Sequence, residues 1–227
     1  MNDHTKTPRP ARNSGQSRRR RATAAPKTAR AAAPSHPVLG QLAATYPALF
    51  GETPRPLKRG IYADLLAAQG DIDAEGLKAV LALHTRSTRY LSSVAAGMAR
   101  HDLQGQAVEA MAPEHVLHAL LEVHRRRQGR SQEDLKPKLR QRIGQAFEAS
   151  GLSREDYALL LPSRDPAIRE LFDQALDEAA ARAAKDAALH RAYSASGMEP
   201  DAFAASYGLP AADVKRMLER VKRREKA

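Results

Sequence analysis

The stretch that decides the fold is Leu77 to Leu91, Leu-Lys-Ala-Val-Leu-Ala-Leu-His-Thr-Arg-Ser-Thr-Arg-Tyr-Leu. Its first half places residues at the i, i+3, i+4, i+7 spacing that predicts an amphipathic helix. The buried face of this helix is expected to carry Leu77, Val80, Leu81 and His84. The hydroxyl-rich segment from Thr85 to Thr88 breaks the pattern, because such side chains compete for backbone hydrogen bonds and favour a cap or turn. A short second helix should begin at Ser87 or Thr88, and its amino end, beside hydroxyls and two arginines, suits an anion such as a phosphate.

The composition of the chain favours helices and a polyanionic partner. Of 227 residues, 42% are hydrophobic but only 4% are aromatic and Trp is absent, so the cores should be small, aliphatic and helical. The net charge of +11 points to nucleic acid. The absence of Cys excludes disulfides and thiolate metal sites and fits a reducing cytoplasm, which is the expected location. No apolar run reaches the length of a membrane span, so no membrane association is expected.

Residues 1–35 form a distinct basic segment. They contain nine Lys and Arg against the single acid Asp3, and so contribute +8 of the total charge. The rest of the segment is too poor in apolar residues to offset the entropy of ordering, which predicts a disordered arm. Such an arm would raise the nonspecific affinity for nucleic acid. A solubilising tail with no specific role is the alternative.

The next segment, residues 36–128, reads as a compact helical domain. A helical pattern is broken at Pro47, and another helix follows Arg55-Pro-Leu-Lys-Arg-Gly, with the cations Lys58 and Arg59 at its start. Cations are unfavourable there, which hints at a bound anion, although solvated surface bases explain them equally well. The stretch from Gly97 to Val108 predicts a β-hairpin that turns at Gln104-Gly105. A closing helix should begin near Pro113 and end in a run of three arginines, which suits the carboxyl end of a helix.

Four motifs follow one another through this segment. They are Tyr46-Pro47, then Arg55-Pro-Leu-Lys58-x-Gly60-Ile-Tyr-x-Asp64-Leu, then Leu77-x-x-x-Leu81-x-Leu-x-Thr85-x-Ser87-x-Arg89-Tyr90-Leu91, then Arg100-x-Asp102-Leu-x-Gly105. In this order they resemble the ProQ/FinO domain of bacterial RNA chaperones, over about residues 36–125. In that family a mostly helical domain binds structured RNA, particularly terminator hairpins of small RNAs and mRNA 3′ ends. A pocket at a helix start receives the 3′-terminal ribose and phosphate, while basic residues follow the stem.

The resemblance implies roles for individual residues. Those implied to bind RNA are Lys58, Lys78, Thr85, Ser87, Arg89, Tyr90 and Arg100, with Gly60 and Asp64 shaping the pocket. Arg86 stands where the family commonly has Ser and adds a cation beside the expected phosphate. Other positions depart from the family: Thr88 replaces a frequent Trp, Ala74 a frequent Lys, and Ala95 a basic residue. Since residues 36–128 hold ten Lys and Arg against nine Asp and Glu, RNA affinity should depend on the basic arm more than in basic relatives.

Residues 129–227 repeat themselves at a period of 46 residues. The segment starting Ala146-Phe-Glu-Ala-Ser-Gly matches the one starting Ala192-Tyr-Ser-Ala-Ser-Gly. Each copy predicts a helix ended by Gly151 or Gly197, a second helix, a turn and a third helix, and the two copies are expected to pack as one all-α bundle. The second copy also places Ala204, Gly208 and Val214 at the spacing of a helix-turn-helix. Its would-be recognition helix begins Ala-Ala-Asp, which offers few donors to DNA bases.

The sequence predicts no catalytic activity, no bound metal and no cofactor. His115, His118, Glu122 and His124 lie on one predicted helix, but a surface or half-buried role suits them better than a metal. The hydroxyls near His84 have no evident oxyanion loop or acidic partner in the sequence.

The sequence therefore predicts a mostly α fold, a ProQ/FinO-like helical domain with a small β-hairpin (36–128), followed by an all-α tandem-repeat region (129–227). The expected function is that of a non-enzymatic RNA chaperone that binds small RNAs, mRNA 3′ ends and hairpins in post-transcriptional regulation. The alternative is a DNA-binding regulator that acts through the helix-turn-helix-like repeat. A further hypothesis is that residues 129–227 dock a protein partner.

Overall fold

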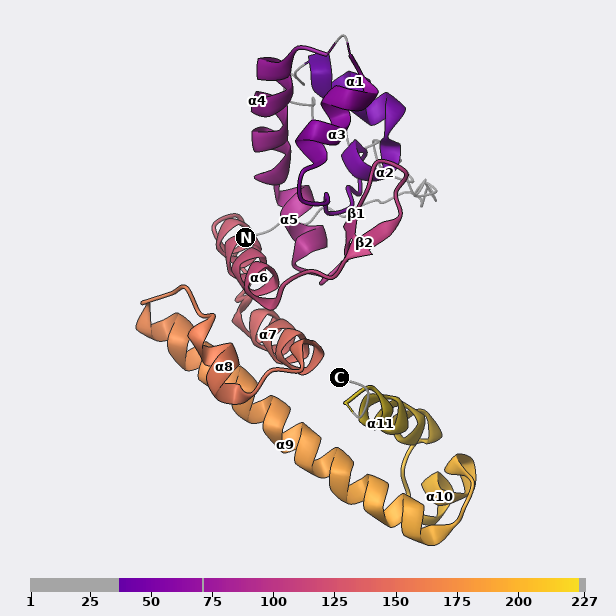
Figure 1. Cartoon of the computed structure of the whole chain (residues 1–227). Helices are drawn as coiled ribbons and strands as arrows, with labels where there is room; N and C mark the ends of the chain where they lie inside the picture. The colour runs from indigo at the N-terminus through magenta and orange to yellow at the C-terminus, as the bar shows by residue number, and fades with distance from the viewer. Residues whose placement is uncertain (1–36, 71, 225–227) are drawn as a thin grey trace, which may run out of the picture. The chain divides into compact units, whose positions relative to one another are not determined.

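The computed structural model describes residues 37–70 and 72–224 (Figure 1). The expected fold, mostly helical with one small antiparallel hairpin, is confirmed. The predicted basic arm, residues 1–35, lies outside the described residues. Within the described part, no helix combines the length and the apolar character needed to cross a bilayer. The elements in chain order are α1 (Pro37–Thr45), α2 (Pro47–Phe50), α3 (Ile61–Ala68), α4 (Ala74–Thr85), α5 (Thr88–Val94), β1 (Arg100–His101), β2 (Ala107–Glu109), α6 (Pro113–Gln128), α7 (Lys136–Ser150), α8 (Arg154–Leu159), α9 (Pro166–Ser196), α10 (Pro200–Ser206) and α11 (Ala211–Arg224).

The helix pair at the centre of the first domain forms as its residues dictate. Asp73 caps α4 by accepting hydrogen bonds from the backbone N–H groups of the first turn. Leu77, Val80 and His84 are buried as predicted, whereas Leu81 is half-buried. The break at the hydroxyl residues is confirmed, and Ser87 caps α5 by accepting a hydrogen bond from the N–H of Tyr90.

The hairpin and the segment before α3 are joined by backbone pairing. β1 and β2 are antiparallel, and the turn between them includes Gly105, whose φ of 74° is left-handed. Leu57 forms an isolated parallel bridge with His101 of β1. Two hydrogen bonds flank that bridge, from His101 N to Pro56 O at 2.7 Å and from Lys58 N to His101 O at 2.9 Å. These bonds hold the backbone of Pro56, Leu57 and Lys58 alongside β1 of the hairpin.

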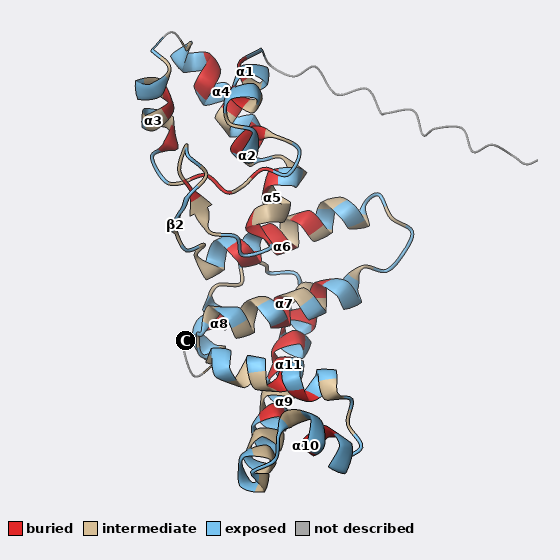
Figure 2. Cartoon of the chain, turned by 90° about the vertical axis from the view of Figure 1, so that its right-hand side faces the viewer, coloured by how far each residue is buried: buried red, intermediate tan, exposed pale blue. Residues whose placement is uncertain are grey.

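The main core is a continuous cluster of buried side chains from Val38 on α1 to Leu176 on α9. It takes in the helices of residues 36–128 together with α7, α8 and the first part of α9, and Figure 2 shows buried residues on both α6 and α7. The division of the chain at residue 128 stays a prediction, and the core runs across it.

The repeats of the carboxyl-terminal region appear as matching helices. α7 ends at Gly151 and α9 ends at Gly197, both with left-handed backbone, as predicted. The third helix of the first copy and the first helix of the second copy are one continuous helix, α9, of 31 residues. α10 and α11 then repeat the arrangement of α8 and the start of α9.

The expectation that both copies pack in one bundle is wrong. The second copy has its own small cluster of buried residues: Phe203, Ala204, Val214 and Met217. The physical reason is the continuity of α9, which extends about 46 Å at 1.5 Å per residue and carries the two apolar faces end to end. Ion pairs connect the copies instead, with Arg224 of α11 reaching both Glu148 of α7 (3.5 Å) and Asp186 of α9 (3.2 Å).

Candidate nucleic-acid interface

Tyr90 and Arg100 hold the segment around Leu57 in place. The Tyr90 hydroxyl accepts a hydrogen bond from Leu57 N at 3.0 Å, and Arg100 Nη1 donates to Leu57 O at 3.1 Å. The Tyr90 ring is buried against His84, with ring centroids 5.3 Å apart. Burial raises the pKa of the Tyr90 phenol, and the Leu57 amide and the Arg100 charge oppose this. These two predicted site residues therefore fix the backbone that carries a third, Lys58.

The cations at the start of α3 have acidic partners. Lys58 Nζ lies 2.7 Å from the Asp64 carboxylate, and Arg59 pairs with Glu109 of β2. The sequence left open a bound anion or solvated surface bases for these two cations, and in the structure each pairs with a carboxylate instead. Gly60 caps α3 with a φ of 81°, a left-handed conformation that costs a residue with a Cβ more than it costs glycine. Of the predicted pocket, Lys58, Gly60 and Asp64 thus gather at one helix start.

The two predicted hydroxyl ligands lie on either side of the junction between α4 and α5, and each has one hydrogen-bonding role already taken. Thr85 donates its hydroxyl proton to Leu81 O at 2.8 Å, which leaves lone pairs on the oxygen as acceptors. Ser87 uses its oxygen as an acceptor for Tyr90 N at 3.2 Å, and its proton has no partner in the described part of the chain. The two hydroxyls therefore offer complementary chemistry: an acceptor at Thr85 and a donor at Ser87.

The cations of the domain divide into those with a carboxylate partner and those without. Lys58, Arg59, Arg100, Arg125 and Arg126 lie within 4.0 Å of an acid. Among the described residues, the exposed cations of residues 37–128 that pair with no carboxylate are Lys78, Arg86, Arg89 and Arg127. They are distributed over α4, the α4–α5 junction, α5 and the end of α6. The first domain is nearly neutral overall, but its free positive charge is concentrated on these neighbouring elements.

A hollow of about 350 Å³ lies beside this surface, between α3 and α4. Its lining includes the half-buried Tyr62 together with Lys78 and Leu81. An aromatic ring next to a free ammonium group is the combination that single-stranded nucleic acid uses, for base stacking and phosphate neutralisation. The sequence predicts Lys78 in the site but assigns no role to Tyr62, because nothing in the local sequence distinguishes this residue from other partly buried positions of a helix.

Arginines from α6 and α7 also reach the site, and sequence reasoning did not place them there. Arg126 Nη1 donates to Arg86 O at 2.7 Å, so the end of α6 is anchored to the α4–α5 junction. The run Arg125-Arg126-Arg127 is visible in the sequence, but there it predicts only a complement to the helix dipole. Arg142 of α7 donates to Ala95 O at the end of α5 at 3.0 Å, and no local pattern in the sequence indicates this contact.

Glu122, the acid on the histidine-rich face of α6, pairs with two arginines of the same helix. Arg125, together with Arg126, lowers the pKa of the Glu122 carboxyl to about 2. No group of three or more His, Cys, Asp or Glu is placed to share a metal ion within residues 37–70 and 72–224.

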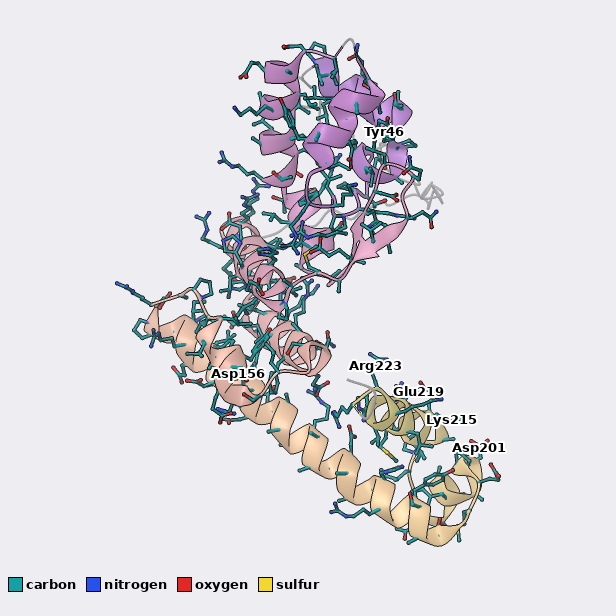
Figure 3. All side chains as sticks on the ribbon, viewed as in Figure 1. Tyr46, Asp156, Asp201, Lys215, Glu219 and Arg223 are labelled. Carbon is teal, nitrogen blue, oxygen red and sulfur yellow. The ribbon has the colours of Figure 1, made fainter. Side chains whose placement is uncertain are left out.

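The surface of the helix-turn-helix-like repeat differs from that of the first domain. Gly208 forms the turn between α10 and α11 with a φ of 65°. Figure 3 shows Lys215 of α11 near Asp201, and their charged atoms are 2.9 Å apart. Most other cations of α11 are paired as well: Arg216 with Asp213, and both Arg220 and Arg224 with Asp186. Lys222 and Arg223 are exposed and have no carboxylate partner among the described residues, so the free positive charge of α11 lies in its last turn, away from the amino end that would enter a DNA groove.

Comparison with known proteins shows what the first domain is similar to. A model of the ProQ/FINO family matches residues 32–136, which confirms the resemblance predicted for about residues 36–125. The RNA chaperone ProQ of Shewanella oneidensis is 41% identical over 88 residues, covering 36% of this chain and 41% of that protein. The RNA chaperone ProQ of Aeromonas salmonicida is 38% identical over 91 residues, covering 37% of this chain and 43% of that protein. The chain thus spans about two fifths of the length of these curated relatives.

A solved structure of a FinO-like RNA chaperone from Neisseria meningitidis is 33% identical, covering 36% of this chain and 85% of that chain with a TM-score of 0.34. The family match ends at the first residue of α7.

Proposed function

Because residues 32–136 are a domain of the ProQ/FinO family, we propose that this protein is an RNA-binding protein and RNA chaperone. It binds hairpins with single-stranded 3′ tails, in small RNAs and at mRNA 3′ ends, and promotes or blocks their pairing with other RNAs. Selectivity comes from the A-form shape and the 3′ end, since side chains cannot read the deep, narrow major groove of double-stranded RNA. The protein acts by binding, without a covalent step, in the cytoplasm. Residues 129–227 offer helical surfaces for a protein partner.

The observation that carries the proposal is the distribution of free positive charge. Lys78, Arg86 and Arg89 are exposed on α4, its junction with α5, and α5, and have no carboxylate partner among the described residues. Cations that are not neutralised within the protein are available to release counterions from phosphates. The paired cations elsewhere on the domain contribute less, because a bound phosphate would have to compete with the carboxylate already there.

The hydroxyls of Thr85 and Ser87 give this surface its preference for an RNA 3′ end. Thr85 Oγ1 accepts a hydrogen bond from a terminal ribose hydroxyl, since its own proton is held by Leu81 O. Ser87 donates to a phosphate oxygen, since its lone pair is held by Tyr90 N. Tyr90 and Arg100 act by holding the Leu57–Lys58 segment against the site.

The test is binding of the full chain to three ligands of equal length. They are a terminator hairpin with a free 3′-hydroxyl, the same hairpin with a 3′-phosphate, and duplex DNA. The proposal predicts the tightest binding to the free 3′-hydroxyl and the weakest to DNA. Equal affinity for all three would reduce the protein to a nonspecific polycation and overturn the proposed selectivity.

A further inference from the structure

One face of α5 is lined by arginines that belong to the two following helices. Their hydrogen-bond acceptors belong to the first residue of α5, to the residue four positions on, and to its C-cap residue seven positions on, a spacing that lies on the same side of a helix. At 1.5 Å per residue, this row extends about 10 Å along the helix axis. The contacts are Arg126 Nη1 to Thr88 Oγ1 at 3.2 Å, Arg127 Nη2 to Ser92 Oγ at 3.3 Å, and Arg142 Nη2 to Ala95 O at 3.0 Å.

Two members of the row, Arg127 and Arg142, have no acidic partner within the part of the chain that the structure describes. Arg126 shares Glu122 with Arg125. Two carboxylates of this region pair with other arginines: Glu178 of α9 with Arg140 of α7, and Glu148 of α7 with Arg182 and Arg224. The two guanidinium groups are therefore neighbouring charges of the same sign without a counter-charge.

The two guanidinium groups are close enough to affect each other and are held in place. Burial lowers the pKa of Arg142, and the charge of Arg127 lowers this pKa further. The link between α6 and α7 is fixed by Gln128, whose side chain donates to Glu133 O at 3.0 Å and accepts from Leu135 N at 2.9 Å. Folding thus pre-forms a repulsive arrangement that an anion between the groups would relieve.

We propose that Arg127 and Arg142 form a second phosphate-binding site, which holds the RNA backbone on the face of α5 beyond the α4–α5 junction. This inference rests on the proposed function. A planar guanidinium group can present two parallel donors to a phosphate, and the row is short enough for neighbouring phosphates of one strand to reach it. The exposed Arg89, three residues before Ser92 on α5, connects this site to the hydroxyls at the α4–α5 junction.

The site extends the RNA-binding surface past the recognised domain. Arg142 lies six residues beyond the last residue of the family match, in the first helix of the repeat region. The repeat region thereby contributes directly to RNA binding through α7, in addition to any role in contacting a partner protein.

A purely structural role for Arg142 is the competing explanation. A cation that donates to the last carbonyl groups of a helix stabilises it, as Arg142 does at Ala95. This role would account for Arg142 alone and would leave Arg127, exposed at the end of α6, without a function. A stability measurement beside the RNA measurement separates the two explanations.

The experiment measures the affinity of the full chain for a 3′-hydroxyl hairpin and for the same hairpin with a 3′-phosphate in about 0.15 M salt. It compares wild type, Arg127→Gln, Arg142→Gln and Arg140→Gln, and thermal unfolding of each variant is measured alongside. Glutamine removes the charge and the guanidinium fork, and leaves an amide donor on a shorter side chain. The control, Arg140→Gln, removes the same charge from α7 at a residue paired with Glu178 (2.9 Å). Losing one phosphate contact should weaken binding about fivefold at this salt concentration and flatten the slope of log K against log salt by about 0.9.

The proposal predicts that Arg127→Gln and Arg142→Gln each show this loss, while Arg140→Gln binds as wild type does and all variants keep the preference for a free 3′-hydroxyl. Wild-type affinity in both variants would overturn this site while leaving the proposed function intact, even if Arg142→Gln unfolds at a lower temperature. Failure of wild type to bind the hairpin would overturn the proposed function and this inference together. Arg127 is exposed at a helix end, so its variant tests the site even where Arg142→Gln is unstable.

Discussion

The hydroxyl of Tyr90 makes a prediction that can be worked out from a single contact. Tyr90→Phe removes the acceptor for Leu57 N (3.0 Å), and Leu57 is only 3% exposed, so water cannot replace the lost partner. An unpaired buried N–H costs about 1–3 kcal/mol of unfolding free energy. For a domain of about 150–250 residues, each kcal/mol lowers Tm by about 2–4 °C, so the expected shift is about 2–12 °C. Thermal unfolding measures the shift, and faster exchange of the Leu57 amide hydrogen locates it.

The matched control is Tyr46→Phe. Tyr46 lies between α1 and α2 (Figure 3), is half-buried, and its hydroxyl has no hydrogen bond within the described part of the chain. Removing that hydroxyl should change the unfolding free energy by less than about 0.5 kcal/mol. If Tyr90→Phe were as stable as Tyr46→Phe and Leu57 exchanged as slowly as in wild type, the role of Tyr90 in holding the Leu57 backbone would be refuted.

Two further predictions concern stability. Burial lowers the pKa of His84 from 6.5, against the opposing hydrogen bond to Leu49, so the unfolded chain binds a proton first as the pH falls. The free energy of unfolding should therefore drop from about pH 7 down to the lowered pKa. In urea denaturation His84→Gln, which keeps a donor for Leu49 O, should show a smaller drop, and an equal drop in both proteins would contradict this. Gly197→Ala should lower the free energy of unfolding by about 1–2 kcal/mol, because a φ of 62° strains any residue that has a Cβ. The added Cβ meets no atom within 4 Å, so no steric clash contributes to this loss. Gly40→Ala, in the helical backbone of α1 with equally open space, should instead raise the free energy of unfolding by up to about 1 kcal/mol. Chemical denaturation measures both variants, and a change of the same sign in both would refute the strain argument.

What could be predicted from the sequence depended on local chemistry. The period of Leu77 to His84 gave the buried face of α4, and the hydroxyl run gave the start of α5, because both features lie within a few residues of the structure they determine. The hairpin turn at Gly105 and the helix ends at Gly151 and Gly197 were predicted for the same reason.

The remaining features depend on residues far apart in the chain. Tyr90 meets Leu57 across 33 residues and Arg142 meets Ala95 across 47, and no periodicity reports such contacts. Arg59 could not be recognised as paired, because Glu109 reaches it from the hairpin. The separation of the second copy's small cluster from the main core follows from α9 being unbroken, whereas the repeat itself indicated only where its helices begin and end.

The central claim is that the unpaired cations at the α4–α5 junction bind RNA phosphates. The most direct measurement is the salt dependence of hairpin binding for full-length wild type, Arg89→Ala and Arg59→Ala. Arg89 has no carboxylate partner among the described residues, whereas Arg59 is an exposed cation paired with Glu109. The basic arm is present in all three proteins and cancels in the comparison. We predict that Arg89→Ala flattens the slope of log K against log salt by about 0.7–0.9, while Arg59→Ala keeps the wild-type slope. Identical slopes for all three proteins would contradict the account.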